Sequence, residues 1–187
     1  AMTLPLTAAD VVRFHDDLIA DPRWPAGAVE LPEAPLWHWI GTNHRNNCLL
    51  WAEEDLARRT RVSDAEIAAN KRAIDGFNQA RNDATERVDE ILLIGLNLVD
   101  AQSARSDAPL STAPAGARLN SETAGSMIDR LSIIALKVHA MRAQTQRQDV
   151  DDAHRAASAV KLERLLQQRA DLGGYLDALL ADCAVSR

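Results

Sequence analysis

A stripe of polar residues centred on a tryptophan lies in the segment 42–61, and its residue types could bind a ligand. If the segment is a helix with about 100° between successive residues, the stripe occupies an arc of roughly 100°. Its members are His44, Asn47, Trp51, Glu54, Asp55 and Arg58. Apolar residues border it on both sides, and a solvated face rarely holds an indole at its centre between apolar borders. We therefore predict that the stripe turns inward, where each charge needs a partner.

A second polar stripe lies on one face of the next helix in the sequence. Its members fall within about 100° of one another; they are Lys71, Asp75, Asn78, Gln79, Asn82, Glu86 and Asp89. Charged neighbours border this stripe, so it can also be read as part of one solvated half of the helix. The amides favour the inward interpretation, because they are middling to poor helix formers retained mainly for specific hydrogen bonds. We predict that the two stripes face each other, with Arg58 or Lys71 paired to a carboxylate across the helices.

Carboxylates on facing helices, together with phosphate oxygens of a substrate, are suitable ligands for Mg²⁺. Glu86 and Asp89 lie one turn apart on one face of a helix. This pair is similar to the second half of the metal signature in all-α nucleoside triphosphate pyrophosphatases, whose first half is a Glu-x-x-Glu pair. The chain has Trp51-x-x-Glu54 at the equivalent place. The expected metal ligands are Glu54, Glu86 and Asp89, with Asp75 as a further candidate, and Mg²⁺ is the one cofactor considered.

The elements that must position these residues are all expected to be helices. Ala, Leu, Arg, Glu and Asp dominate the long segments, and β-branched alternation is absent. Thr7 is a suitable N-cap, and Ser63 with Glu66 forms a capping box. The predicted helices span 7–20, 36 or 42 to 61, 63 to about 100, 121–148 and 151–184. The expected fold is all-α, an antiparallel bundle of about five helices with a polar stripe inside.

The chain is expected to form one domain over residues 1–187. Residues 1–35 supply the N-terminal helix and a Pro-rich loop, and the Ser-, Ala- and Pro-rich segment 101–118 is the expected mobile loop. The hydrophobic content is 47% and the net charge is −6, which argues against nucleic acid or an anionic membrane as a general partner. The two cysteines lack CxxC spacing, and no apolar run approaches a membrane span. We expect a cytoplasmic protein with a small-molecule ligand, and a homodimer is the assembly considered.

Three ordered blocks of residues carry a family resemblance. They are His44-x-x-Asn47-x-x-Leu50-Trp51-x-x-Glu54-Asp55-x-x-Arg58, Lys71-x-x-Ile74-Asp75-x-x-Asn78-Gln79-x-Arg81-Asn82-Asp83-x-x-Glu86-x-x-Asp89, and Asn120-Ser121-Glu122-Thr123-x-Gly125-x-x-x-Asp129-Arg130-Leu131-Ser132-Ile133-x-x-Leu136-Lys137. Together they closely resemble the bacterial family of unknown function called DUF4254, over nearly the whole chain from about Thr42. The resemblance implies that these polar residues belong to the family pattern, and it implies a loose association with glycan or secondary-metabolite biosynthesis. It names no reaction.

The fourth predicted helix should add one acidic edge to the site. Glu122 and Asp129 lie close in helical angle, while Arg130 and Lys137 lie about a quarter turn away. The remaining bulk of this helix should belong to the core; it consists of Met127, Ile128, Leu131, Ile134 and Val138.

Two functional hypotheses follow from these residues. The first is an enzyme acting on a small polar substrate, phosphorylated, nucleotide-like or sugar-like, with Asp75, Glu86 or Asp89 as the base or metal ligand. Its substrate contacts would come from His44, Asn47, Trp51, Arg58, Lys71, Asn78, Gln79, Asn82, Asp129 and Arg130, of which Arg58, Lys71 and Arg130 would hold the anion. The second is a non-catalytic structural or partner-binding protein whose buried polar network fixes helix packing. An open pocket favours the first, and a closed, mutually satisfied network favours the second.

Overall fold

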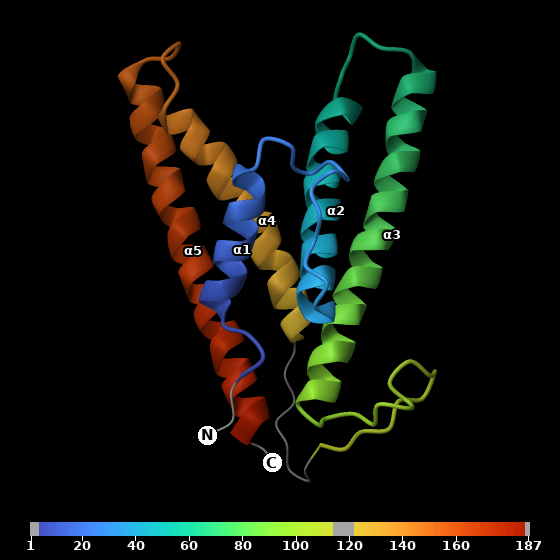
Figure 1. The fold of residues 1–187 in the computed structure, drawn as a ribbon. Helices are drawn as coiled ribbons and strands as arrows, with labels where there is room; N and C mark the ends of the chain where they lie inside the picture. Colours follow the sequence, from blue (N-terminus) through green and yellow to red (C-terminus); the bar gives the residue numbers. More distant parts are fainter. Residues whose placement is uncertain (1–3, 114–121, 186–187) are drawn as a thin grey trace.

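The computed structural model describes residues 4–113 and 122–185, and the described part of the chain contains five helices (Figure 1). They are α1 (Ala8–Ala20), α2 (Pro35–Ala57), α3 (Asp64–Gly95), α4 (Ala124–Thr145) and α5 (Asp152–Val185). The predicted all-α bundle of five helices is therefore confirmed. Outside the helices, the described residues include one isolated β-bridge, between Val99 and Ser111.

Local signals in the sequence explain where most helices begin. Thr7 caps α1 by accepting a hydrogen bond from the backbone N–H of Asp10, and Ser63 and Glu66 form the predicted capping box of α3. The second helix begins one residue before the earlier of its two predicted starts, because Pro35 occupies its first turn. The third helix ends before the predicted Asp100, and Asn97, just beyond it, adopts a φ of 56°.

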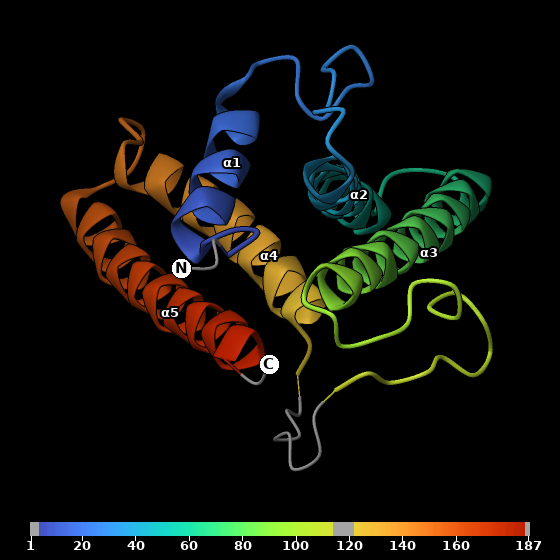
Figure 2. The same cartoon turned by 60° about the horizontal axis from the view of Figure 1, so that its bottom comes forward.

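The helices form two antiparallel pairs that diverge from one end of the molecule (Figure 1). One pair is α2 with α3, and the other is α4 with α5. The short helix α1 packs against α4 and α5. Figure 2, in which the closed end is turned toward the viewer, shows α4 lying between α5 and α3.

The hydrophobic core lies where the two pairs converge. It combines the start of α2 with the ends of α3 and α5, the start of α4 and one face of α1; its most buried members include Val11, Ile40, Val88, Ile128, Leu131, Leu176 and Leu180. Met127 and Val138 of α4 are buried and Ile134 is partly buried, so the predicted core face of α4 is confirmed. None of the helices in the described ranges is both long and apolar enough to cross a membrane.

The segment between α3 and α4 is non-helical as far as it is described. Arg105 Nε donates to Glu90 Oε1 at 2.9 Å, which holds part of this segment against α3. The predicted mobile loop 101–118 coincides with it, although residues 114–118 lie outside the described residues.

Candidate functional site

A network of buried polar side chains joins α2, α3 and α4. Asn43 Nδ2 donates to Asp129 Oδ1 at 2.9 Å and to Thr85 Oγ1 at 3.2 Å. Asn47 Nδ2 donates to the same oxygen of Asp129 at 3.0 Å and to Ser132 Oγ at 3.0 Å. Asn43, Asn47 and Ser132 are all buried. These contacts bind three helices together through hydrogen bonds rather than through apolar packing.

Asp129 supplies the charge of this network. Its Oδ1 lies 3.6 Å from Arg81 Nε of α3, so a carboxylate on α4 reaches both α2 and α3. Asp129 therefore contacts the α2 stripe through Asn47, and its expected part in binding a substrate stays a prediction. Glu122 does not join the network: it forms an ion pair with Arg130 at 2.8 Å, and both line a different pocket against α5. The expected acidic edge of α4 is thus reduced to Asp129.

His44 extends the network toward α1. Its Nδ1 lies 2.7 Å from Ser132 Oγ, and because Ser132 Oγ accepts from Asn47, the hydroxyl is placed to donate to His44. The ring stacks on His15 at 4.4 Å and on Trp24 at 5.5 Å between centroids. Burial lowers the pKa of His44 to about 4, so the ring is neutral at pH 7. His44 and Ser132 have the atoms of a nucleophile–base pair, but both are 0% exposed, which denies a substrate access.

Cys48 closes the network on the side of Trp24. Trp24 Nε1 donates to Cys48 Sγ at 3.2 Å, and His44 Nε2 lies 4.0 Å from the same sulfur. Burial raises the pKa of the Cys48 thiol to about 11, which keeps it protonated and unreactive at neutral pH. A Cys48–His44 nucleophile is therefore not supported. Among the described residues, His15 and Arg81 are exceptions to the satisfied polar groups. Both ring nitrogens of His15 and the Nε of Arg81 are buried without a hydrogen-bond partner, and burial holds the pKa of His15 well below its usual value.

The stripe centred on Trp51 turns inward along only half of its length. His44 and Asn47 are buried and Trp51 is half-buried, whereas Glu54, Asp55 and Arg58 are exposed. Arg58 Nη2 pairs with Asp55 Oδ1 at 2.8 Å on the same helix, which corrects the expectation of an ion pair across the helices. The physical reason is the divergence of the helix pairs, since the last turns of α2 extend beyond the part of α4 that covers its start (Figure 1).

The stripe on α3 is mainly solvated, which corrects the inward interpretation. Five of its seven members are exposed and two are half-buried; the exposed ones are Lys71, Asp75, Gln79, Asn82 and Glu86, and the half-buried ones are Asn78 and Asp89. Gln79 donates to Asp83 on the same helix at 2.8 Å. The polar residues of α3 that contact α2 are others, because α2 covers a neighbouring face: the buried Asn70 donates to Glu53 at 2.8 Å, and the half-buried Thr85 contacts Asn43.

The three expected metal ligands do not come together. The contact between Glu53 and Asn70 places the end of α2 level with residue 70 of α3, whereas Glu86 lies 16 residues further along (86 − 70 = 16). At about 1.5 Å per residue this separates Glu54 from Glu86 by roughly 24 Å. Within the two described ranges, no three His, Cys, Asp or Glu side chains gather as a metal would require. The set Glu54, Glu86 and Asp89 is therefore not one site.

Asp89 holds the N-terminus of α4. Its Oδ1 accepts a hydrogen bond from the backbone N–H of Gly125 at 2.7 Å, and the Thr123 side chain also hydrogen-bonds to it. Burial raises the pKa of Asp89, and these hydrogen bonds oppose the rise. A negative charge at this position interacts favourably with the helix dipole.

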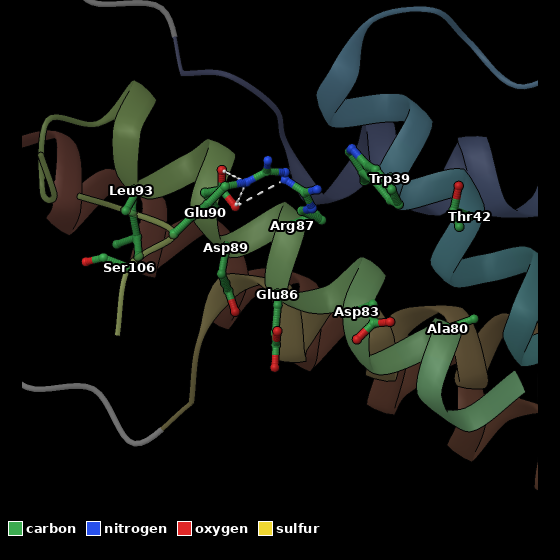
Figure 3. Close-up of a pocket in the computed structure, with 12 residues that line it drawn as sticks. Trp39, Thr42, Ala80, Asp83, Glu86, Arg87, Asp89, Glu90, Leu93 and Ser106 are labelled. Atoms are coloured by element: carbon green, nitrogen blue, oxygen red, sulfur yellow. Dashed lines mark hydrogen bonds and ion pairs between the residues drawn. The ribbon is translucent and has the colours of Figure 1, made fainter. Parts of the chain in front are cut away.

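An open pocket of about 720 Å³ lies beside Asp89, between α3, the start of α2 and the segment after α3 (Figure 3). We call it the acidic pocket, because four carboxylates and two guanidinium groups line it; they are Asp83, Glu86, Asp89, Glu90, Arg87 and Arg105. Glu86 and Asp89 extend in the same direction from α3 (Figure 3). Both guanidinium groups contact Glu90, Arg105 at 2.9 Å and Arg87 at 3.6 Å. Trp39 and Thr42 of α2 also line it.

Sequence reasoning missed several members of the buried network. His15, Asn43, Asn70 and Thr85 were given no role, and Ser132 was noted only within a sequence block. Helical spacing carried part of the signal, because Asn43 lies one turn before Asn47 and Ser132 lies one turn after Asp129. The predicted anion-binding residues Arg58, Lys71 and Arg130 lie apart on α2, α3 and α4, and none of them lines the acidic pocket.

Comparison with known proteins gives one match. The model of a family described as a protein of unknown function, DUF4254, matches residues 37–187. This range includes all three polar blocks, the network apart from His15 and Trp24, and the acidic pocket. No curated protein matches the chain, and no solved structure does.

Proposed function

The chain belongs to the DUF4254 family, and we propose that it is an enzyme that binds a small polar molecule in the acidic pocket. The observation that carries this proposal is a cavity of about 720 Å³ containing two carboxylates one turn apart, Glu86 and Asp89. The volume falls within the range of about 300–1,000 Å³ found for small-molecule sites. Asp75, the third carboxylate expected to act in catalysis, lies outside this pocket and has no part in the proposal.

The charges of the pocket indicate what it would bind. Four acidic and two basic side chains line it, and both basic groups contact Glu90. A phosphorylated ligand would meet an excess of negative charge there. An uncharged polyhydroxyl compound such as a sugar, or a compound carrying an amine, fits better, because carboxylates accept hydrogen bonds from hydroxyl and ammonium groups. Arg87, whose guanidinium carbon lies 5.4 Å from the centroid of the Trp39 ring, adds a planar donor at the wall.

The two carboxylates would have different parts in the reaction. Glu86 is exposed, so it can reach a bound ligand and accept a proton from it. The carboxylate of Asp89 is half-buried and accepts hydrogen bonds from the Gly125 N–H and from Thr123. We assign the proton-acceptor part to Glu86 and a ligand-positioning part to Asp89.

A thermal-shift screen of sugars, amines, nucleotides and sugar phosphates, each with and without Mg²⁺, tests the proposal. A ligand that binds only the folded state must raise Tm. We expect hits among neutral or cationic polar compounds, and we expect Glu86→Gln to remove the shift while leaving the Tm of the free protein unchanged. Asp75→Asn is the matched control, because Asp75 is exposed on α3 outside the pocket. Equal responses of the two variants to a hit would contradict the proposal.

A second candidate function is that of a non-catalytic helical protein. The observation that favours it is the closure of the network, in which Asn43, Asn47 and Ser132 find partners within the fold. Buried polar networks can be retained for structural specificity without adding stability. A screen without a single hit would favour this second function over the first.

A further inference from the structure

A second pocket lies in the fork between the diverging helix pairs. It has a volume of about 400 Å³ and is bounded by α2, α4 and α5. Its apolar walls are Trp51, Ala140, Met141 and Leu165, all of which are partly buried. We call it the fork pocket. It shares no lining residue with the acidic pocket, so conclusions about one do not depend on the other.

Three exposed cationic side chains line the same pocket: Lys137 of α4 and Lys161 and Arg164 of α5. No acidic residue lines it. The sequence also offers these cations no acidic neighbour along their own helices, because no Asp or Glu stands three or four residues before or after any of them. In the described part of the chain, none of the three forms an ion pair or a hydrogen bond through its side chain. Three uncompensated cations are notable in a chain of net charge −6.

Trp51 gives this pocket an aromatic wall at its α2 side. The indole is half-buried and stands at the point where its stripe passes from the buried network to solvent. An indole combines a large apolar surface with an N–H donor, and it is suited to a ligand that is apolar at one end and polar at the other. The stems of lysine and arginine can cover apolar surface while their charged ends stay in water.

We propose that the fork pocket binds a small organic acid whose apolar body packs against Trp51, Met141 and Leu165. The anionic head group would lie at the rim, within reach of Lys137, Lys161 and Arg164. Charge complementarity selects the head group, because the rim supplies only positive charge. The volume of about 400 Å³ selects a small molecule rather than a long lipid chain. The ligand class is therefore a carboxylate carried on a medium-length aliphatic or aromatic group.

Decanoate is a suitable probe, and tryptophan fluorescence is a suitable readout. The full chain is titrated with decanoate, with decanol as the tail without the charge, with acetate as the head group without the tail, and with decyltrimethylammonium as the opposite charge. We expect saturable binding of decanoate alone, with a change in emission that Trp51→Phe removes. The apparent affinity should fall as the ionic strength rises, because the attraction to an exposed rim is screened by salt.

Charge variants test the rim directly. The double variant Lys161→Gln with Arg164→Gln should bind decanoate roughly tenfold more weakly, since each ion pair at an exposed position changes an affinity by roughly twofold to fivefold. Lys71→Gln is the matched control, because Lys71 is an exposed lysine on α3 that does not line the pocket. All three positions are exposed, so folding should be unaffected, and circular dichroism checks this.

Three results would overturn the proposal. Equal affinity for decanol and decanoate, or an unchanged affinity in the double variant, would mean that the cations do not select the ligand. If a second copy of the chain occupies the pocket, sedimentation experiments would show a dimer, and Trp51→Phe or the double variant would dissociate it. That result would exclude the small acid as the occupant.

Discussion

The carboxylate of Asp89 and the backbone of Gly125 approach each other so closely that any side chain at position 125 would displace the carboxylate. Asp89 Oδ1 accepts from the Gly125 N–H at 2.7 Å, and a Cβ built on Gly125 would lie 2.8 Å from the Asp89 carboxyl group. The glycine in the third sequence block therefore has a steric reason, and the contact joins the end of α3 to the start of α4.

The variant Gly125→Ala should lower the free energy of unfolding by about 1–3 kcal/mol, because the added methyl group displaces the Asp89 carboxylate from its hydrogen bond at the start of α4. Gly76→Ala is the control. Position 76 lies within α3, where a Cβ would meet nothing within 4 Å, so this change should raise the free energy of unfolding by about 0.5–1 kcal/mol. Urea titration measures both. Two stabilised variants would show that the Asp89 contact tolerates a side chain.

The free energy of unfolding should decrease as the pH is lowered below 6.5, because the buried His15 and His44 resist protonation in the folded protein. Burial lowers the pKa of His44 from 6.5 to about 4, and that of His15 well below 6.5. Between pH 6.5 and about 4 the unfolded chain binds protons that the folded chain excludes, so the free energy of unfolding decreases with falling pH. Each such group changes the free energy of unfolding by at most about 1.4 kcal/mol per pH unit in this range, and it has little effect well above pH 6.5.

His15→Phe tests this assignment, because it keeps a ring on His44 and removes one titrating group. Its free energy of unfolding should depend less steeply on pH between 6.5 and 4 than that of the wild type. His139→Gln should keep the wild-type slope, since His139 is exposed. An unchanged slope in His15→Phe would assign the acid sensitivity to other groups.

Ser132→Ala should lower the free energy of unfolding by about 1–3 kcal/mol. The change removes the buried hydroxyl that pairs with Asn47 Nδ2 and His44 Nδ1, so both nitrogens lose a hydrogen bond. Ser126 is the comparison on the same helix: its hydroxyl contacts Glu122 near the surface, so Ser126→Ala should cost less. Equal costs, measured by urea unfolding, would contradict a special role for the buried network.

Thiol reagents should distinguish the two cysteines. The pKa of Cys48 is raised to about 11 and the residue is buried, whereas Cys183 is partly exposed. At pH 8 the folded protein should react at Cys183 first, and Cys48 should react only after denaturation. Mass spectrometry of the labelled peptides identifies the order. Rapid labelling of Cys48 in the folded state would reveal an opening between α2 and Trp24.

The sequence predicted the helices well because each carries local information. The caps at Thr7 and Ser63 and the apolar face of α4 all act within a few residues, and the structure has a helix wherever one was expected. The polar stripes were harder to interpret. Periodicity identifies which residues share a face, but it does not say how far the neighbouring helix extends along that face.

The stripe of α2 illustrates this limit. Asn47 and Glu54 share a face, yet Asn47 meets Asp129 and Glu54 meets solvent, because α4 leaves α2 between them. On α3, the polar face was recognised and its surroundings were not: α2 covers the neighbouring face that carries Asn70 and Thr85. The angle between two helix pairs is a tertiary property, and no single segment encodes it.

The arrangement in two pairs also has a consequence for the order of folding. The helices of each pair are consecutive in sequence, so each pair can form as a hairpin that closes only a short loop. The contacts most distant in sequence belong to α1, where the Ala8 N–H reaches Asp177 at 2.8 Å and Arg169 reaches Asp16 at 2.9 Å. Docking of α1 joins the first turn of the described chain to its last helix. Because distant contacts form slowly relative to local ones, this docking is the step that should set the folding rate.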